Sequence, residues 1–243
     1  MSGHSKWHKI QHKKGKADAA RSNVFTKLTR AITVAAQEGG GDPEMNFSLR
    51  LAIEKAKSAN VPKDNIERAV KKGTGELKSE DKLKKVVYEG FGPGGVAIVI
   101  ESVTDNTNRT VAEVKHVLNK FDGSLGGPGS VLWQFEQKGV VRFVIDKKDK
   151  IENWEEAQLK FMDAGIEDIR ESDDGVELIT NKDNFQKMIE VVSELEIEPD
   201  DSGLQWVAKE EIEIDDEISK KMEALYDELE ELDDVKEVYT NEK

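Results

Sequence analysis

The chain of 243 residues contains no cysteine. This absence excludes disulfide bonds, thiolate zinc sites and thiol nucleophiles, and it favours a reducing compartment. Long apolar runs are missing too: no segment approaches the ~20 residues that a membrane-spanning helix needs. The charged start of the chain also lacks the apolar region of a signal peptide. We therefore expect a cytoplasmic protein without a membrane segment.

Apolar residues are scarce for a globular protein. They make up 37% of the chain and aromatic residues only 6%, whereas charged residues make up 35%. A chain of this length can hold one to three domains, and so many charges require a large surface relative to the core. The composition therefore favours several small modules over one large globule.

Motifs for catalysis or cofactor binding are absent as well. The chain has no G-x-x-x-x-G-K-[ST] phosphate loop, no H-E-x-x-H zinc motif and no Ser-His-Asp set. Residues 92–97 fit G-x-G-x-x-A, but β-branched residues follow where a dinucleotide site needs a helix. His4, His8 and His12 are spaced four apart, yet neighbouring lysines would repel a metal ion and no acid completes a ligand set. We expect no enzyme, no cofactor and no metal.

Net positive charge is confined to one end of the chain. Residues 1–30 carry +7, because eight cations face the single acid Asp18. The cations are Lys6, Lys9, Lys13, Lys14, Lys16, Arg21, Lys27 and Arg30. The whole chain carries −14, so residues 31–243 carry −21. Such a split suits a protein that holds a polyanion at one end, and it indicates nucleic acid as the partner.

The basic segment itself divides into an arm and a helix face. In residues 1–15 we expect the lysines and His12 to contact phosphates, and Trp7 either to stack on a base or to anchor the arm on the helical domain. Lys16, Asn23, Lys27 and Arg30 share one face of the following helix. That face could follow a phosphate backbone or be an ordinary polar surface. No recognition helix can be identified, so sequence-specific base readout is not predicted.

The first domain is predicted to be helical. An apolar stripe predicts a helix over residues 16–38, ended by three glycines at 39–41. Asp42 and Pro43 are expected to start a second helix that runs to about Asn60, and Pro62 a third that ends at Gly73. Residues 74–82 form a polar hinge.

Beyond the hinge the pattern changes to strands. Residues 84–90 and 96–104 predict a hairpin, followed by a helix capped at Asn106 or Thr107 and a strand over 131–135. Residues 139–207 follow the order βαββαβ, which is ferredoxin-like. A final helix (216–232) and strand (235–239) are expected to complete the hairpin's sheet. The predicted class is α+β with three domains: 1–76, 77–137 with 209–243, and 138–208.

Several motifs together resemble those of the YebC/PmpR family. They are residues 3–46 (GHSKWHKI…GGGDPEMN), 60–62, 73–75, 88–95 (YEGFGPGG), 104–110 (TDNTNRT) and 126–135. The resemblance covers nearly the whole chain. It implies three domains, one helical and two α/β, and a non-enzymatic cytoplasmic protein of the kind described as a DNA-binding transcriptional regulator. It also implies an alternative, because mitochondrial relatives activate translation and bacterial members resemble factors that act on ribosomes stalled at proline runs.

Two loops rich in glycine and proline remain as candidate contacts. One contains Phe91, Gly92, Pro93, Gly94 and Gly95, and the other Gly126, Gly127, Pro128 and Gly129. They are either plain turns or, as the resemblance implies, elements that approach an RNA backbone or a ribosomal channel. DNA-associated regulation and ribosome binding therefore both stay open, while a carboxylate-based hydrolase is disfavoured. We expect a monomer.

Overall fold

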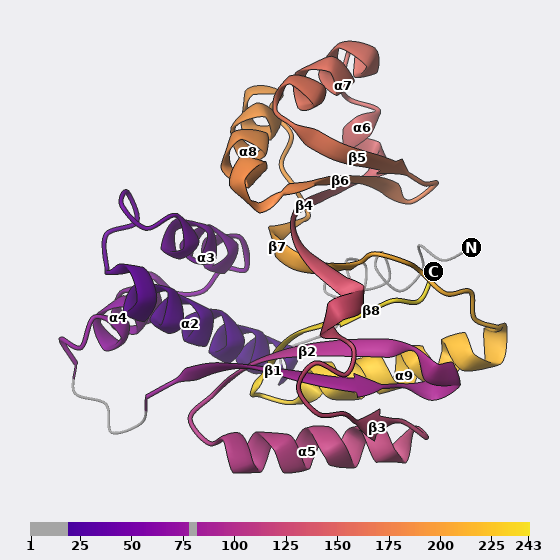
Figure 1. The fold of residues 1–243 in the computed structure, drawn as a ribbon. Coiled ribbons are helices and arrows are strands. Elements are labelled where there is room, and N and C mark those ends of the chain that lie inside the picture. Colours follow the sequence, from indigo (N-terminus) through magenta and orange to yellow (C-terminus); the bar gives the residue numbers. More distant parts are fainter. Residues whose placement is uncertain (1–18, 78–81) are drawn as a thin grey trace. The chain divides into compact units, whose positions relative to one another are not determined.

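A computed structural model describes residues 19–77 and 82–243 of the chain (Figure 1). The described residues separate into two compact units. One comprises residues 133–213 and 241–243, and the other the described parts of 16–132 and residues 214–240. Each unit contains one four-stranded sheet, and within residues 19–77 three helices precede the first strand. The predicted α+β class with an N-terminal helical region is confirmed.

The helical region consists of α2 (Ala19–Gly39), α3 (Phe47–Ser58) and α4 (Lys63–Gly73). Gly40, with φ of 86°, ends α2 as the glycine run predicts. The predicted start of the second helix at Asp42 and Pro43 is wrong, because residues 43–45 form a turn and Asn46 is the N-cap. The Oδ1 atom of Asn46 accepts from Leu49 N, and its Nδ2 donates to Ala35 O at 2.8 Å. Asn46 therefore ties the start of α3 to α2.

The three helices share one apolar core, built from the side chains that the sequence places at helical spacing. Its buried members are Ile32, Ala35, Ala36, Leu49, Ala56, Val61, Ile66 and Ala69. Ridge-to-groove packing brings α4 very close to α2: a Cβ at Gly73 would lie 2.3 Å from the carbonyl oxygen of Thr33. Only glycine permits this approach, so Gly73 determines how closely α4 packs on α2.

The sheet of the same unit has the strand order β3-β1-β2-β8. Its strands are β1 (Lys84–Phe91), β2 (Ala97–Thr104), β3 (Ser124–Leu125) and β8 (Val235–Thr240). The strands β1 and β2 form the predicted hairpin, with Gly90 opposite Ile98. The final strand β8 pairs antiparallel with β2, as the sequence led us to expect. Residues far apart in the chain therefore build one sheet.

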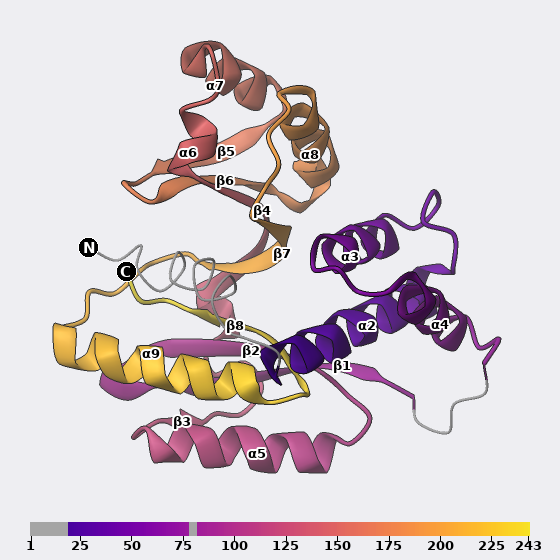
Figure 2. The same ribbon diagram turned by 180° about the vertical axis from the view of Figure 1, so that it is seen from behind.

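Two helices cover one face of this sheet, α5 (Thr107–Lys120) and α9 (Asp216–Glu231) (Figures 1 and 2). Glycines in β1 and the following turn admit them closely, because a Cβ at Gly90 would meet Leu118 and one at Gly92 would meet Met222. Asn106 caps α5 and Asp215 caps α9 through side-chain oxygens. The heptad-like apolar positions of α9 are thus used for packing on the sheet, with Met222, Leu225 and Leu229 buried.

The second sheet has the order β5-β6-β4-β7 and is fully antiparallel. It contains β4 (Phe135–Val144), β5 (Ile166–Glu171), β6 (Gly175–Asn181) and β7 (Asp201–Ala208), with the helices α6 (Ile145–Lys148), α7 (Trp154–Asp163) and α8 (Phe185–Glu194). Phe143 contacts Trp154 of α7, and Gly139 lies against Phe185 of α8, so both helices pack on one face. This is the predicted ferredoxin-like βαββαβ order.

The strand predicted over residues 131–135 is wrong. Residues Leu132–Gln134 form a 3-10 turn (η2), and β4 starts at Phe135. The amides of Val131 and Leu132 donate to a carboxylate and not to a neighbouring strand. Among the described residues, no helix is long and apolar enough to cross a membrane.

Candidate nucleic-acid interface

The predicted arm lies outside the described residues. This applies to Lys6, Trp7, Lys9, His12, Lys13, Lys14 and Lys16. Arg21 falls within the first turns of α2, which begins at Ala19. Along the sequence the arm precedes α2, the longest helix among the described residues, and its contacts with phosphate remain a prediction.

The two remaining cations of the basic segment are engaged within the protein. The Nζ atom of Lys27 donates to the carbonyl oxygen of Glu230. The Nη1 atom of Arg30 donates to the carbonyl oxygen of Asp233 and to Oδ1 of Asp234, both at 2.7 Å. Lys27 thus attaches α2 to the last turn of α9, and Arg30 attaches it to the turn between α9 and β8, both across about 200 residues of sequence.

Asp234 is the centre of this attachment. Its side chain is 1% exposed, and its Oδ2 atom accepts from Arg109 Nη2 at 2.6 Å, Thr110 Oγ1 at 2.8 Å and Thr104 Oγ1 at 3.0 Å. Together with Arg30, four side chains from α2, β2 and α5 converge on one carboxylate. Three of them belong to residues 104–110, the motif that contributed to the family resemblance.

These contacts keep Asp234 ionised. Burial by itself raises the pKa of a carboxyl group, but the hydrogen bonds from Arg109, Thr110, Thr104 and Arg30 lower it further than burial raises it. The pKa of Asp234 therefore lies below its ordinary value of 3.8. In turn, the hydrogen bond to Asp234 raises the pKa of Arg109. We call these five side chains the Asp234 cluster.

The structure brings the two Gly/Pro loops together at one end of the β1–β2 sheet. Gly90 and Phe91 pair with Leu125 and Ser124, and a Cβ at Gly123 would lie 2.6 Å from the carbonyl oxygen of Phe91. Gly94, Gly95, Gly127, Pro128 and Gly129 are exposed, whereas Gly92 and Pro93 are buried. The two loops are therefore adjacent at their bases, and each presents exposed backbone.

Glu89 holds the second of these loops in shape. Its carboxylate is buried and accepts from the backbone amides of Gly129 at 2.6 Å, Leu132 at 2.7 Å and Val131 at 2.9 Å. Burial raises the pKa of Glu89, but the three amide hydrogen bonds lower it more, so the pKa lies below its ordinary value. The amides of this loop thus already hold an anion, which is part of the chain itself.

The neighbourhood of the first loop is acidic. A Cβ at Gly94 would lie 2.7 Å from Cδ1 of Ile218, so this loop lies on the first turn of α9. That turn carries Asp216 and Glu217, both exposed. A partner that reaches Gly94 therefore meets carboxylates, and the loop end is less suited to phosphate than the cationic segments are.

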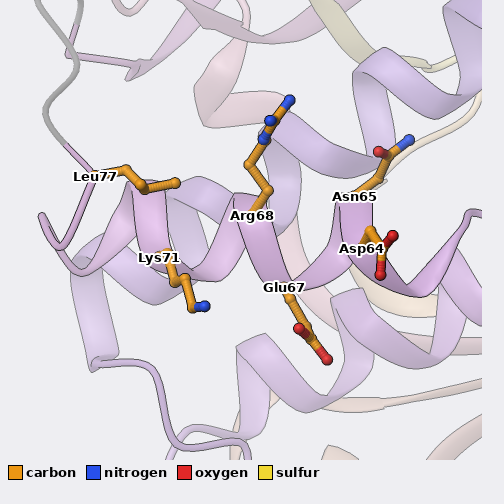
Figure 3. Close-up of a pocket in the computed structure, with 6 residues that line it drawn as sticks. All are labelled: Asp64, Asn65, Glu67, Arg68, Lys71 and Leu77. Carbon is orange, nitrogen blue, oxygen red and sulfur yellow. The ribbon is translucent and has the colours of Figure 1, made fainter.

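A third surface was not singled out by sequence reasoning. An open hollow of about 490 Å³ lies against α4 and is lined by Asp64, Asn65, Glu67, Arg68, Lys71 and Leu77 (Figure 3). All six residues are exposed. Asn65 and Arg68 point to one side of the helix, Glu67 and Lys71 to the other, and Leu77 stands at its end (Figure 3).

The described part of the chain gives little support for a catalytic site. No group of three or more His, Asp or Glu side chains there could hold a metal ion. His116, the histidine outside the arm, lies exposed on α5. The other large polar group, Arg142 with Glu177, Asp201 and Gln205, joins three strands of the ferredoxin-like sheet through mutual hydrogen bonds.

The chain folds into a helical segment, a sheet that carries the two loops and a ferredoxin-like sheet. This arrangement defines a multidomain α+β protein whose cations are concentrated in its first domain. The chain belongs to the TACO1/YebC family. The model of the TACO1/YebC N-terminal domain matches residues 5–76, and that of the second and third domains matches residues 83–242. The resemblance inferred from the motifs is confirmed.

Relatives and a solved structure cover almost the whole chain. Probable transcriptional regulatory proteins from Natranaerobius thermophilus and Thermoanaerobacter pseudethanolicus are 45% and 46% identical to it, over 99% of this chain and 96% of each relative. The crystal structure of a conserved hypothetical protein from Aquifex aeolicus is similar, with a TM-score of 0.84 and 39% identity over 94% of this chain and 92% of that one. The names of the curated relatives describe regulators and no enzymatic reaction.

Proposed function

We propose that this protein is a non-enzymatic regulator of gene expression that binds nucleic acid through its N-terminal basic segment, with DNA as the target. The observation that carries the proposal is the charge contrast of +7 in residues 1–30 against −21 in the remainder. Cations that neutralise phosphates release counterions and so supply affinity without base contacts. The names of the relatives, which describe transcriptional regulation, support the same role.

The second candidate is a translation factor that binds the ribosome and relieves stalling, for example at proline runs. The observation that favours it is the pair of exposed Gly/Pro loops that are adjacent at their bases, the second of which is held by Glu89. Such backbone can approach RNA or a narrow channel more closely than bulky side chains permit. The carboxylates of α9 beside the first loop repel phosphate, so this loop can approach only other groups of the partner. Both candidates require the basic segment, and both fit a cytoplasmic monomer.

Co-sedimentation with ribosomes in the presence of excess duplex DNA, over a series of salt concentrations, separates the candidates. Retention on ribosomes at physiological salt supports the translation factor, and transfer to DNA supports the transcriptional regulator. If the protein binds neither ribosomes nor DNA, the proposal is contradicted. On DNA, equal affinity for promoter and scrambled duplexes would exclude regulation by specific direct binding.

The dependence on the arm is tested with a charge reversal. We expect Lys9→Glu, Lys13→Glu, Lys14→Glu and Lys16→Glu together to abolish binding while thermal unfolding stays nearly unchanged. The matched control reverses four exposed lysines elsewhere, Lys115, Lys150, Lys182 and Lys220, which alters net charge equally. Equal losses in both variants would mean that overall charge, and not the arm, determines binding.

A further inference from the structure

We propose that the outer face of α4 is a second phosphate-contacting surface, formed by Arg68, Lys71 and Lys72. This inference rests on the proposed nucleic-acid binding and extends it from the arm to a structured helix. The ligand is the sugar–phosphate backbone of a nucleic acid. The face supplies affinity and orientation, and it does not read bases.

The first argument is that these cations have no partner in the described part of the chain. Most other cations there interact with groups of the protein. Examples are the ion pairs of Arg30 and Arg109 with Asp234, Arg142 with Glu177, Lys85 with Glu38, and Lys120 with Glu228. By contrast, no described carboxylate forms an ion pair with Arg68, Lys71 or Lys72. Their charge is therefore available to an external anion.

The second argument is their spacing. Lys71 and Lys72 follow Arg68 by three and four residues, which places the three residues within about one turn of α4. The side chains of Arg68 and Lys71 point to opposite edges of the exposed part of that turn (Figure 3). Within α4, the four cations Lys63, Arg68, Lys71 and Lys72 outnumber the two acids Asp64 and Glu67. Lys63 lies 3.6 Å from Glu67 and partly neutralises it. The C-terminal half of α4 thus carries a local charge of +3 in a chain whose net charge is −14.

The third argument is shape. The amide of Leu77 donates to the carbonyl oxygen of Lys71 at 3.1 Å, which folds residues 74–77 back over the end of α4. Arg68 and Lys71 line an open hollow of about 490 Å³ together with Asp64, Asn65 and Glu67, and the Leu77 side chain forms its end wall (Figure 3). A backbone segment can thus lie in a concavity, with its phosphates at the cations and a sugar against Leu77.

The fourth argument is rigidity. The opposite face of α4 is buried through Ile66 and Ala69, and the Oγ1 atom of Thr33 donates to the carbonyl oxygen of Ala69. Gly73 lets α4 approach α2 to contact distance. The cations therefore lie on a helix that is fixed to α2, the helix that follows the basic arm in the sequence. Preorganised donors of this kind lose little entropy on binding.

The test is the salt dependence of binding by the full-length chain, with duplex DNA of mixed sequence and with ribosomes as the two probes. For Arg68→Ala, Lys71→Ala and Lys72→Ala together, we expect affinity for duplex DNA to fall about 10-fold or more at low salt. The slope of log K against log[salt] should become shallower by roughly 2 to 3, because about three phosphate contacts are lost. On ribosomes we expect a corresponding loss of retention at lower salt.

The control triple Lys150→Ala, Lys182→Ala and Lys220→Ala removes the same charge from exposed sites elsewhere and should keep affinity within about twofold. Thermal unfolding of both triples should match the unaltered chain, since all six side chains are exposed. If the unaltered chain binds a probe and the α4 triple shows the same affinity and slope, the α4 surface is wrong and the proposed function stands. If the unaltered chain binds neither probe, both fall.

Discussion

Two buried carboxylates in the same unit are held in opposite ways. Asp234 accepts from the side chains of two arginines and two threonines, contributed by α2, β2 and α5. Glu89 accepts from three backbone amides within four consecutive residues of one loop. Both carboxyl groups have lowered pKa values. The first fastens distant segments to each other, and the second shapes a single loop.

The two arrangements differ in the groups that bind the carboxylate and in the charge that remains on it. Guanidinium groups neutralise Asp234, so the cluster carries charge of both signs and makes Arg30 a structural residue. Backbone amides supply only partial charges, so Glu89 keeps a net negative charge beneath the Gly/Pro loop. The comparison predicts global effects when Asp234 is altered and local effects when Glu89 is altered.

Asp234→Asn should produce the largest effect. The substitution removes a buried charge from between Arg30 and Arg109, and breaking such a pair costs about 3 kcal/mol or more. We expect the free energy of unfolding, measured with urea, to fall by about 3 kcal/mol, and α2 amides to exchange faster with solvent. Asp233→Asn is the control, because the side chain of Asp233 is exposed, and it should change stability by less than about 0.5 kcal/mol. Equal effects of the two substitutions would contradict the central place of Asp234.

Glu89→Gln should have a smaller effect that is confined to the loop. The amide keeps the size of the side chain but loses the charge and one acceptor, and hydrogen bonds to a charged group contribute about 1.5–3 kcal/mol. We expect a loss of about 2 kcal/mol, with hydrogen exchange accelerated at Gly129, Val131 and Leu132. Glu113→Gln on α5 serves as the control. Faster exchange throughout the sheet would show that Glu89 supports more than its loop.

Arg30→Ala tests whether this cation belongs to the fold or to the interface. Because Arg30 makes two hydrogen bonds to the α9–β8 turn, we expect stability to fall by about 1–2 kcal/mol. A double-mutant cycle with Asp234→Asn should show non-additivity. The salt slope of nucleic-acid binding should stay within measurement error. A slope that becomes shallower by about 1 would instead return Arg30 to the phosphate-contacting set.

The smallest effect concerns acid. The pKa values of Asp234 and Glu89 in the folded protein lie below the ordinary values of 3.8 and 4.5. Both carboxylates therefore stabilise the fold above about pH 5, and that stabilisation is lost as pH falls through the ordinary values toward the lowered ones. In Asp234→Asn or Glu89→Gln, the dependence of unfolding free energy on pH should flatten below pH 4.5 by up to about 1 kcal/mol per pH unit. Unchanged curves would mean that neither carboxyl titrates in this way.

Local patterns in the sequence predict much of this fold. Apolar periodicity gives the helices, β-rich runs on both sides of a Gly/Pro turn give the hairpin, and the βαββαβ order gives the ferredoxin-like sheet. The isolated tail helix and strand could be assigned to the first sheet because they cannot form a domain alone. The error over residues 131–135 has a clear cause, since the apolar run there resembles a strand while its amides belong to Glu89.

The site was harder to predict from the sequence. The spacing of Lys27 and Arg30 shows that they share a face of α2, but it cannot show that Glu230, Asp233 and Asp234 occupy that face. No pattern marks Asp234, which follows a run of other acids. The α4 cations could have been found by comparing acids and bases helix by helix, although only the structure shows that they form no ion pair with a described carboxylate.

The long separation between Arg30 and Asp234 has a consequence for how the protein is made. The carboxylate is synthesised 204 residues after the arginine that binds it. At about 5–20 residues per second, α2 waits roughly 10–40 seconds for its partner. During that interval residues 133–213 are completed and can fold as a unit, while β2 still lacks its neighbouring strand β8. The first domain is therefore the first to emerge from the ribosome and the last to gain its contacts with the turn before β8.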